Sequence, residues 1–156
     1  MDSDRCETIS TEKFVTSNYY ETIFELHPFA GLVVDDNIRV IDFNRAGFHL
    51  IGKELREVNR LLAGEAMQCI HATEAPGGCG TTPDCQECVL RNSATETFLS
   101  QKGVRRIACM ELHRDGAVVK VPFLVATAPI VETLRVLTLV TLQDLREIPS
   151  LGCSFR

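Results

Sequence analysis

Basic clusters and long apolar runs are what this chain of 156 residues lacks. Its formal net charge is −5, and its longest basic run is the pair Arg105-Arg106. Proteins that bind nucleic acids or anionic membranes normally present a basic stripe, so we expect neither partner. The opening residues, MDSDRCETIS, lack the apolar region of a signal peptide, and the apolar stretches VPFLVATAPIV and LRVLTLVTL are too short to span a bilayer. The sequence therefore predicts a cytoplasmic protein.

Motifs of catalysis are missing as well. The chain shows no convincing Ser/His/Asp arrangement, P-loop, G-x-G-x-x-G sequence or C-x-x-C-H haem attachment, so we do not expect an enzyme. Hydrophobic residues make up 45% and charged residues 24% of the chain, which is typical of a globular protein. We expect a polar leader at residues 1–16, one domain at 17–147 and a short tail at 148–156.

The order of the predicted elements begins with a helix from Ser17, which His27-Pro28 ends. Two strands follow, Ala30–Asp35 and Ile38–Phe43, and Asp36-Asn37 joins them as a hairpin. NRAGFHLIG is typical of a short helix closed by its last glycine. A longer helix is expected from near Pro83 to Gly103, with Thr82 as its N-terminal cap. Three strand-like runs complete the chain, with turns at RDG and at residues 129–133.

This order, together with VVDDNIRVIDFNRAGFHLIG, resembles a PAS sensory domain. The matching features are the strand-turn-strand, Asn44 and Ala46 after it, the ending Leu50-Ile51-Gly52, and Asp144 near the end of LVTLQDLRE. The resemblance covers roughly residues 17–147 and implies an α+β fold, with a five-stranded antiparallel sheet and short helices over one face. It also implies a role in sensing or relaying signals, and dimerisation.

Four of the seven cysteines lie in CIHATEAPGGCGTTPDCQECVLRN, residues 69–92. Their spacing is C-x9-C-x5-C-x2-C, and the four residues are Cys69, Cys79, Cys85 and Cys88. Cytoplasmic thiols stay reduced, so a close group of cysteines predicts metal binding or redox chemistry better than a disulfide framework. We expect Cys85 and Cys88 on one face of the helix from Pro83, where free amides and the helix dipole favour thiolates.

The resemblance narrows the choice of cofactor, because some PAS domains of sensor kinases carry an iron–sulfur cluster on four cysteines in this region. We therefore predict an iron–sulfur cluster on all four cysteines, with a structural zinc ion as the alternative. His71 is the candidate to replace one cysteine as a ligand. Thiols that switch to disulfides without any metal remain open, while Cys109 is expected in the core.

The predicted function is a sensory or signal-relay module whose metal site responds to redox state, oxygen or iron. One alternative is a protein-interaction module with structural zinc, and another is a PAS domain that binds a small organic ligand and has redox-active thiols. Apolar residues on both faces of the last strand favour a homodimer. The resemblance also implies a separate or fused signalling effector, such as a histidine kinase.

Overall fold

A computed structural model describes residues 17–148. The predicted leader and nearly all of the predicted tail lie outside these residues. The helices of the described chain are α1 Ser17–Leu26, α2 Arg45–Ile51, α3 Leu55–Val58, α4 Ala63–Ala66, α5 Ile70–Glu74 and α6 Val89–Ser100, with 3-10 turns η1 Pro83–Glu87 and η2 Leu145–Glu147. The strands are β1 Ala30–Val34, β2 Val40–Phe43, β3 Val104–Arg114, β4 Ala117–Val131 and β5 Val136–Asp144.

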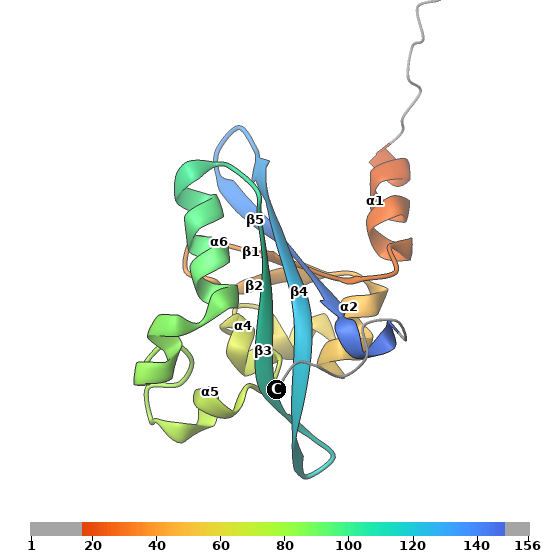
Figure 1. Ribbon diagram of the computed structural model, residues 1–156. Helices are drawn as coiled ribbons and strands as arrows, with labels where there is room; N and C mark the ends of the chain where they lie inside the picture. The colour runs from red at the N-terminus through yellow and green to blue at the C-terminus, as the bar shows by residue number, and fades with distance from the viewer. Residues whose placement is uncertain (1–16, 149–156) are drawn as a thin grey trace, which may run out of the picture.

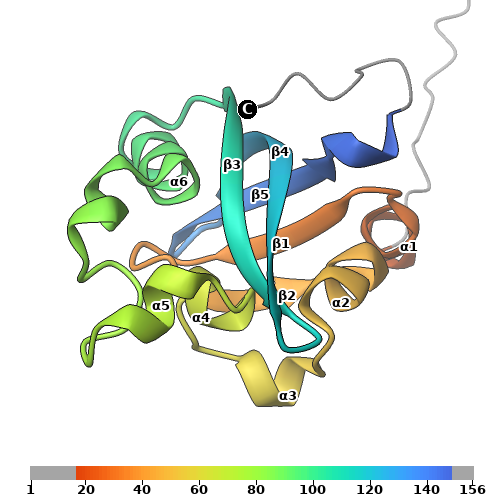
Figure 2. The ribbon, with the colours of Figure 1, turned by 60° about the horizontal axis from the view of Figure 1, so that its bottom comes forward.

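The described strands form one antiparallel five-stranded sheet in the order β2-β1-β5-β4-β3. The predicted α+β class and sheet are therefore confirmed. Side chains alternate between the two faces of a strand, and the inward face is the apolar one, as Val121, Phe123 and Val125 of β4 show. The helices from α2 to α6 surround this inner face, whereas α1 lies beside α2 at the margin of the fold (Figures 1 and 2).

The core between the helices and the inner face contains Leu32, Val40 and Val140 from the strands and Met67 and Leu90 from the helical side. Each such side chain contributes about 1.5–3 kcal/mol when it is fully removed from water. The helices that follow the hairpin are short, so their place depends on this packing more than on their own propensity. Met67 precedes the cysteine-bearing segment and Leu90 lies near its end, so apolar contacts hold both ends of the segment against the sheet.

Asn44 fixes the junction between β2 and α2. Its side chain is 1% exposed, and its Oδ1 accepts hydrogen bonds from the Gly31 amide at 2.9 Å and the Gly47 amide at 2.8 Å. Its Nδ2 donates to the carbonyl of Phe29 at 3.0 Å. The residue is therefore both the N-terminal cap of α2 and a link to β1, and the predicted closing glycine of α2, Gly52, has the expected left-handed φ of 73°.

Two strand boundaries differ from the prediction. The hairpin strand begins at Val40 because Ile38 has a φ of 62°, and the Asp35 carboxylate accepts from the amides of two following residues, which lengthens the turn. The turn between the last two strands was placed too early, since β4 continues to Val131. Pro129 pairs with Thr138 beyond the end of the β3 pairing, where β4 no longer needs a donor on that side.

The predicted continuous helix from Pro83 to Gly103 is wrong. Residues 83–87 form a 3-10 turn, and Cys88, with φ −64° and ψ 110°, separates it from α6. Extended backbone at one residue redirects the chain, so the two segments have different axes. Thr82 occupies the capping position as predicted, but its hydroxyl makes no capping hydrogen bond.

The α6 helix and the end of β5 are tied down by polar contacts. The hydroxyls of Thr97 and Thr127 lie 2.5 Å apart and join α6 to β4, while Thr127 Oγ1 also accepts from the Val104 amide at 3.2 Å. At the end of β5, burial opposes ionisation of Asp144, but hydrogen bonds from Arg146 outweigh it and lower the pKa of the carboxyl group. Both contacts fix elements that border the inner face.

Candidate metal centre

The four predicted ligand cysteines line one small cavity between the short helices and β3. Cys69 directly precedes α5, Cys79 lies in the loop after it, Cys85 belongs to η1, and Cys88 stands between η1 and α6. The other walls are mostly apolar side chains, among them Ile38, Leu90 and Met110. The fold therefore brings these four side chains to one place, even though the helix expected to carry two of them is broken.

Cys69 is fixed by its backbone. Its amide donates to the carbonyl of Gly64 at 2.8 Å, and it forms an isolated antiparallel bridge with Leu112 of β3. This bridge connects the beginning of the cysteine segment to the sheet. Burial raises the pKa of the Cys69 thiol, the amides of α5 oppose this effect, and the neighbouring thiols Cys88 and Cys79 raise the pKa further.

Cys79 depends on a glycine for its position. A Cβ built on Gly64 would lie 2.6 Å from Cys79 Sγ and 3.3 Å from its Cβ, closer than side chains approach one another. Only glycine at residue 64 leaves room for this thiol against α4. The loop that carries Cys79 contains two glycines with positive φ, Gly78 at 78° and Gly80 at 90°, one on each side of this cysteine.

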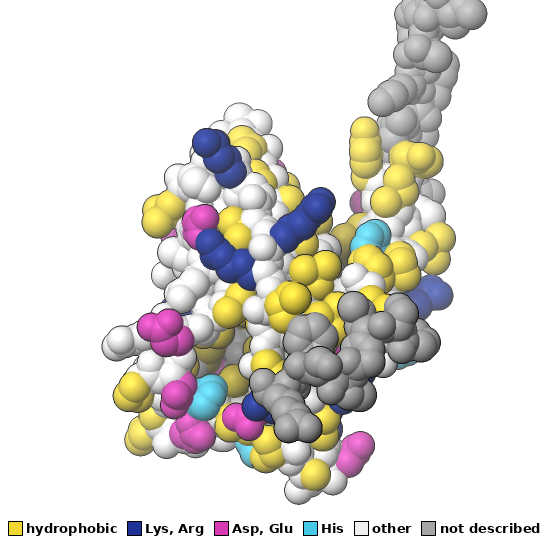
Figure 3. All heavy atoms as spheres, viewed as in Figure 1, with side chains coloured by type: hydrophobic (Ala, Val, Ile, Leu, Met, Phe, Trp, Pro, Cys, Tyr) yellow, Lys and Arg dark blue, Asp and Glu magenta, His cyan; other side chains and the backbone are white. Residues whose placement is uncertain are grey.

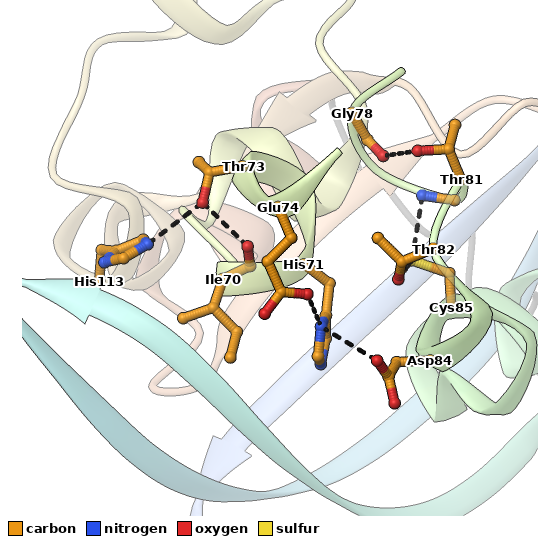
Figure 4. Close-up of polar contacts among 11 residues, drawn as sticks. Ile70, His71, Thr73, Glu74, Gly78, Thr81, Thr82, Asp84, Cys85 and His113 are labelled. Carbon is orange, nitrogen blue, oxygen red and sulfur yellow. Dashed lines mark hydrogen bonds and ion pairs between the residues drawn. The ribbon is translucent and has the colours of Figure 1, made fainter. Parts of the chain in front are cut away.

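Cys85 is the best stabilised as a thiolate. Its Sγ accepts from the Gly80 amide at 3.3 Å. The Thr82 hydroxyl lies 3.2 Å from the same sulfur, and Figure 4 shows Thr82 next to Cys85. Burial by itself would raise the pKa of Cys85, but the hydrogen bonds from Thr82 and Gly80 and the nearby His71 lower it overall. The Thr82 hydroxyl, which was expected to cap a helix, therefore contacts the sulfur of Cys85 instead. A metal binds a cysteine in its deprotonated form, the thiolate.

Cys88 lies at the beginning of α6, and its thiol is coupled to two others. Burial raises its pKa most, the amides of Arg91 and Leu90 lower it, and the charges of Cys79 and Cys85 raise it again. Several thiols that oppose one another's ionisation gain from a shared cation, because the cation removes the repulsion. The neighbouring thiols help to raise the pKa of Cys69 and of Cys88, and a shared metal ion would remove this repulsion.

His71 also borders the cavity, but it faces carboxylates. Its Nδ1 lies 2.7 Å from Glu74 Oε2 and 3.7 Å from Asp84 Oδ2 (Figure 4). The hydrogen bond with Glu74 raises the pKa of His71; slight burial opposes this, and the charges of Glu74 and Asp84 add to it. The ligand atoms of His71, Glu74 and Asp84 lie within 4.8 Å of one another, so His71 is grouped with these two carboxylates rather than with the thiols.

Two features of the cavity bear on which metal would fit. In a tetrahedral site with Zn–S bonds of about 2.3 Å the sulfur atoms lie about 3.8 Å apart. Within residues 17–148, no three of the cysteine sulfurs lie within 4.8 Å of one another. The four sulfur atoms are therefore not all as close as a tetrahedral zinc site requires. The cavity itself is small, with a volume of about 30 Å³.

Other outcomes concern residues that the sequence placed differently or missed. Cys109 is exposed, so its predicted place in the core is wrong: β3 turns this position outward, and the alternate residues Ala108 and Met110 face the core. The described cysteines are all free thiols. Arg91 and Gly64 line the cavity and were not predicted. Arg91 follows Cys88 by three residues, which is one helical turn, so spacing could have pointed to it.

The comparisons with known proteins agree with the fold. A family model described as PAS domain matches residues 18–85. The PAS domain of nitrogen regulation protein NR(II) from Vibrio parahaemolyticus is 16% identical over 80% of this chain and 96% of that chain, with a TM-score of 0.58. A PAS domain from Colwellia psychrerythraea is 18% identical over 83% and 97%, with a TM-score of 0.59. No curated protein matches the chain by sequence.

A third similar structure is a PAS domain from a two-component sensor histidine kinase, 6% identical over 81% of this chain and 94% of that one, with a TM-score of 0.54. At such low sequence identities, the structural similarity is evidence for the fold alone. Residues 18–85 match the family model of the PAS domain, and the fold of the described chain is that of PAS domains. None of the helices described is long and apolar enough to cross a bilayer.

Proposed function

We propose that this PAS domain is a cytoplasmic sensory and signal-relay module without catalytic activity of its own, and that its four cysteines hold a metal centre. An iron–sulfur cluster that responds to redox state, oxygen or iron is the first candidate. The observation that carries the proposal is the common cavity of Cys69, Cys79, Cys85 and Cys88. Thiolates bind such clusters, and amide or hydroxyl donors to sulfur tune them.

A signal from the centre would reach the sheet through two short routes. Cys88 directly precedes α6, which is joined to β4 by the contact between Thr97 and Thr127. Cys69 pairs with Leu112 of β3. Loss or oxidation of the metal would free the cysteine loop and the beginning of α6. Because α6 contacts β4 and Cys69 pairs with β3, the positions of both strands would change.

The outer face of the sheet is the proposed contact with a second copy of the chain. Helix α1 lies at this face, where Tyr20, Ile23 and Leu139 line a common hollow. Tyr20 is 64% and Ile23 49% exposed, and Figure 3 shows apolar side chains on α1 and on the neighbouring part of the sheet. Exposed apolar side chains gathered in this way favour a homodimer, which would pass the change to a separate or fused effector such as a histidine kinase.

A structural zinc ion is the second candidate for the centre, and the small cavity volume favours it. A pocket for a small organic ligand is the third. It is favoured by a hollow of about 420 Å³ near the end of β5, lined by Phe123, Leu142 and Arg114 among others. Ligand pockets of about 300–1,000 Å³ with a few polar groups are common in proteins. In that case the thiols would be redox-active without a metal.

The test is to purify the protein without oxygen, record its visible spectrum, and measure iron, zinc and sulfide per chain. Brown protein with iron and sulfide supports the cluster, and colourless protein with one zinc per chain supports the structural site. Substituting Cys85→Ser or Cys88→Ser should remove the metal. The matched control is Cys109→Ser, because this exposed cysteine lies outside the cavity. Anaerobic protein without any metal would refute both candidates.

A further inference from the structure

We propose that Arg91 supplies positive charge to the cysteine cavity. This charge raises the affinity of the four cysteines for a metal ion and, if they hold a cluster, raises its reduction potential. This inference rests on the proposed function, since it concerns the charge of that centre. It concerns a side chain that ligates nothing itself.

The position of Arg91 is unusual for an arginine. It borders the cavity beside the four cysteines, and its Nη2 donates towards Cys79 Sγ at a distance of 4.0 Å. Its Nε is buried and has no hydrogen-bond partner in the described chain. A buried donor without a partner costs about 1–3 kcal/mol, and more for a charged group. Arg91 as a whole is only partly buried, but the unpaired Nε at its inner end is explained if an anion belongs beside it.

Gly80 makes room for this arginine. A Cβ built on Gly80 would collide with Arg91 Nη2, and the residue has a φ of 90° that side chains rarely adopt. The same glycine donates its amide to Cys85 Sγ at 3.3 Å. One residue therefore places a backbone donor on one thiol and allows a guanidinium to approach another, and both groups favour negative charge on sulfur.

The negative charge of the proposed metal centre would be the missing partner of the Arg91 guanidinium. Four thiolates around one divalent ion carry a net charge of about −2, and an oxidised four-iron cluster on four thiolates carries the same. In a cavity lined by apolar groups this charge is only weakly screened, so a cation in contact with it has a large effect. Among the described residues that line the cavity, the other basic side chain is His71, which is paired with Glu74.

The experiment uses Zn²⁺ as the probe, bound to the reduced protein without oxygen and titrated against a coloured chelator. Arg91→Met keeps the length and apolar contacts of the side chain but removes its charge. We expect it to bind Zn²⁺ about 10–100-fold more weakly than the wild type, as for other changes next to metal ligands. Arg91→Lys, which keeps the charge, should recover most of the loss. The matched control is Arg56→Met on the exposed surface of α3, which should bind like the wild type.

The outcomes separate this inference from the proposed function. Wild-type affinity in Arg91→Met, or equal losses in Arg91→Met and Arg91→Lys, would overturn the role of charge while leaving the metal site intact. If the wild type binds no Zn²⁺ and the protein isolated without oxygen contains no iron and sulfide, both this inference and the proposed metal centre are overturned. If the isolated protein contains iron and sulfide, Arg91→Met should also lower the midpoint potential, because reduction adds negative charge that the arginine no longer offsets. An unchanged potential would count against the inference.

Discussion

Gly64→Ala is the substitution that most directly tests where the structure places Cys79. In an isolated helix the change would be favourable by up to about 1 kcal/mol, because alanine is the better helix former. In this structure the added methyl group would lie 2.6 Å from Cys79 Sγ and 3.6 Å from the Cβ of Cys69. The thiol side chain is short, so α4 or the loop at Cys79 has to move.

The expected size of the effect follows from this overlap. Forcing one extra methyl group into a packed site typically costs about 1–3 kcal/mol, from which the helix propensity is subtracted. We therefore expect Gly64→Ala to lower the free energy of unfolding by about 0–2 kcal/mol. In a Cys79→Ala background the sulfur is absent, so most of this cost should disappear. Because the helix propensity is the same in both backgrounds, the coupling between the two substitutions should equal the cost of the overlap, about 1–3 kcal/mol.

The assay is urea unfolding of the wild type, both single variants and the double variant, with reductant and chelator present so that no variant holds a metal. A cost of Gly64→Ala that is the same with and without the Cys79 sulfur would refute the close contact. So would a gain in stability from Gly64→Ala alone. Either result would place Cys79 away from α4 and would remove one side of the common cavity.

The remaining predictions concern the elements around the site. Asn44→Ala leaves two buried amides without an acceptor and should cost about 2–4 kcal/mol in urea unfolding, whereas exposed Asn37→Ala should stay within about 0.5 kcal/mol. Thr127→Val should destabilise more than Thr97→Val, which should cost about 1 kcal/mol, since only Thr127 also bonds a backbone amide; equal losses would contradict this. The lowered pKa of Asp144 implies a contribution to stability that is present at neutral pH and is lost as the pH falls through that pKa. The wild type should therefore be more stable than Asp144→Asn at neutral pH, and this difference should shrink below about pH 4. A difference in stability that grows in acid would contradict the prediction.

Much of the fold could be read from local patterns. Alternating apolar residues predicted the long final strands, and Asp115 and Gly116 form the predicted turn with φ values of 50° and 78°. The glycine that closes α2 was equally clear, because a left-handed residue is required there. These features depend on neighbours along the chain, which is why the sequence alone could show them.

The errors arose where tertiary contacts overrode local preference. Residues 83–100 favour one helix by propensity, yet the chain bends at Cys88 so that its side chain faces the cavity. Thr82 has the pattern of a helix cap, but its hydroxyl contacts a sulfur atom instead. Cys109 lies in an apolar run whose phase could not be fixed without the partner strands.

For the cysteine segment, the sequence by itself determined that four cysteines, at a spacing that could bind a metal, occur in a glycine-rich loop of a PAS-like chain. Only the tertiary structure shows that Cys69 lines the same cavity as the other three cysteines, where a bridge to β3 holds its backbone. It also decided that Gly64 admits the thiol of Cys79 and that the guanidinium of Arg91 borders the same cavity. Spacing limits which residues can approach one another, whereas the charge and size of a buried site depend on segments that meet only when the chain has folded.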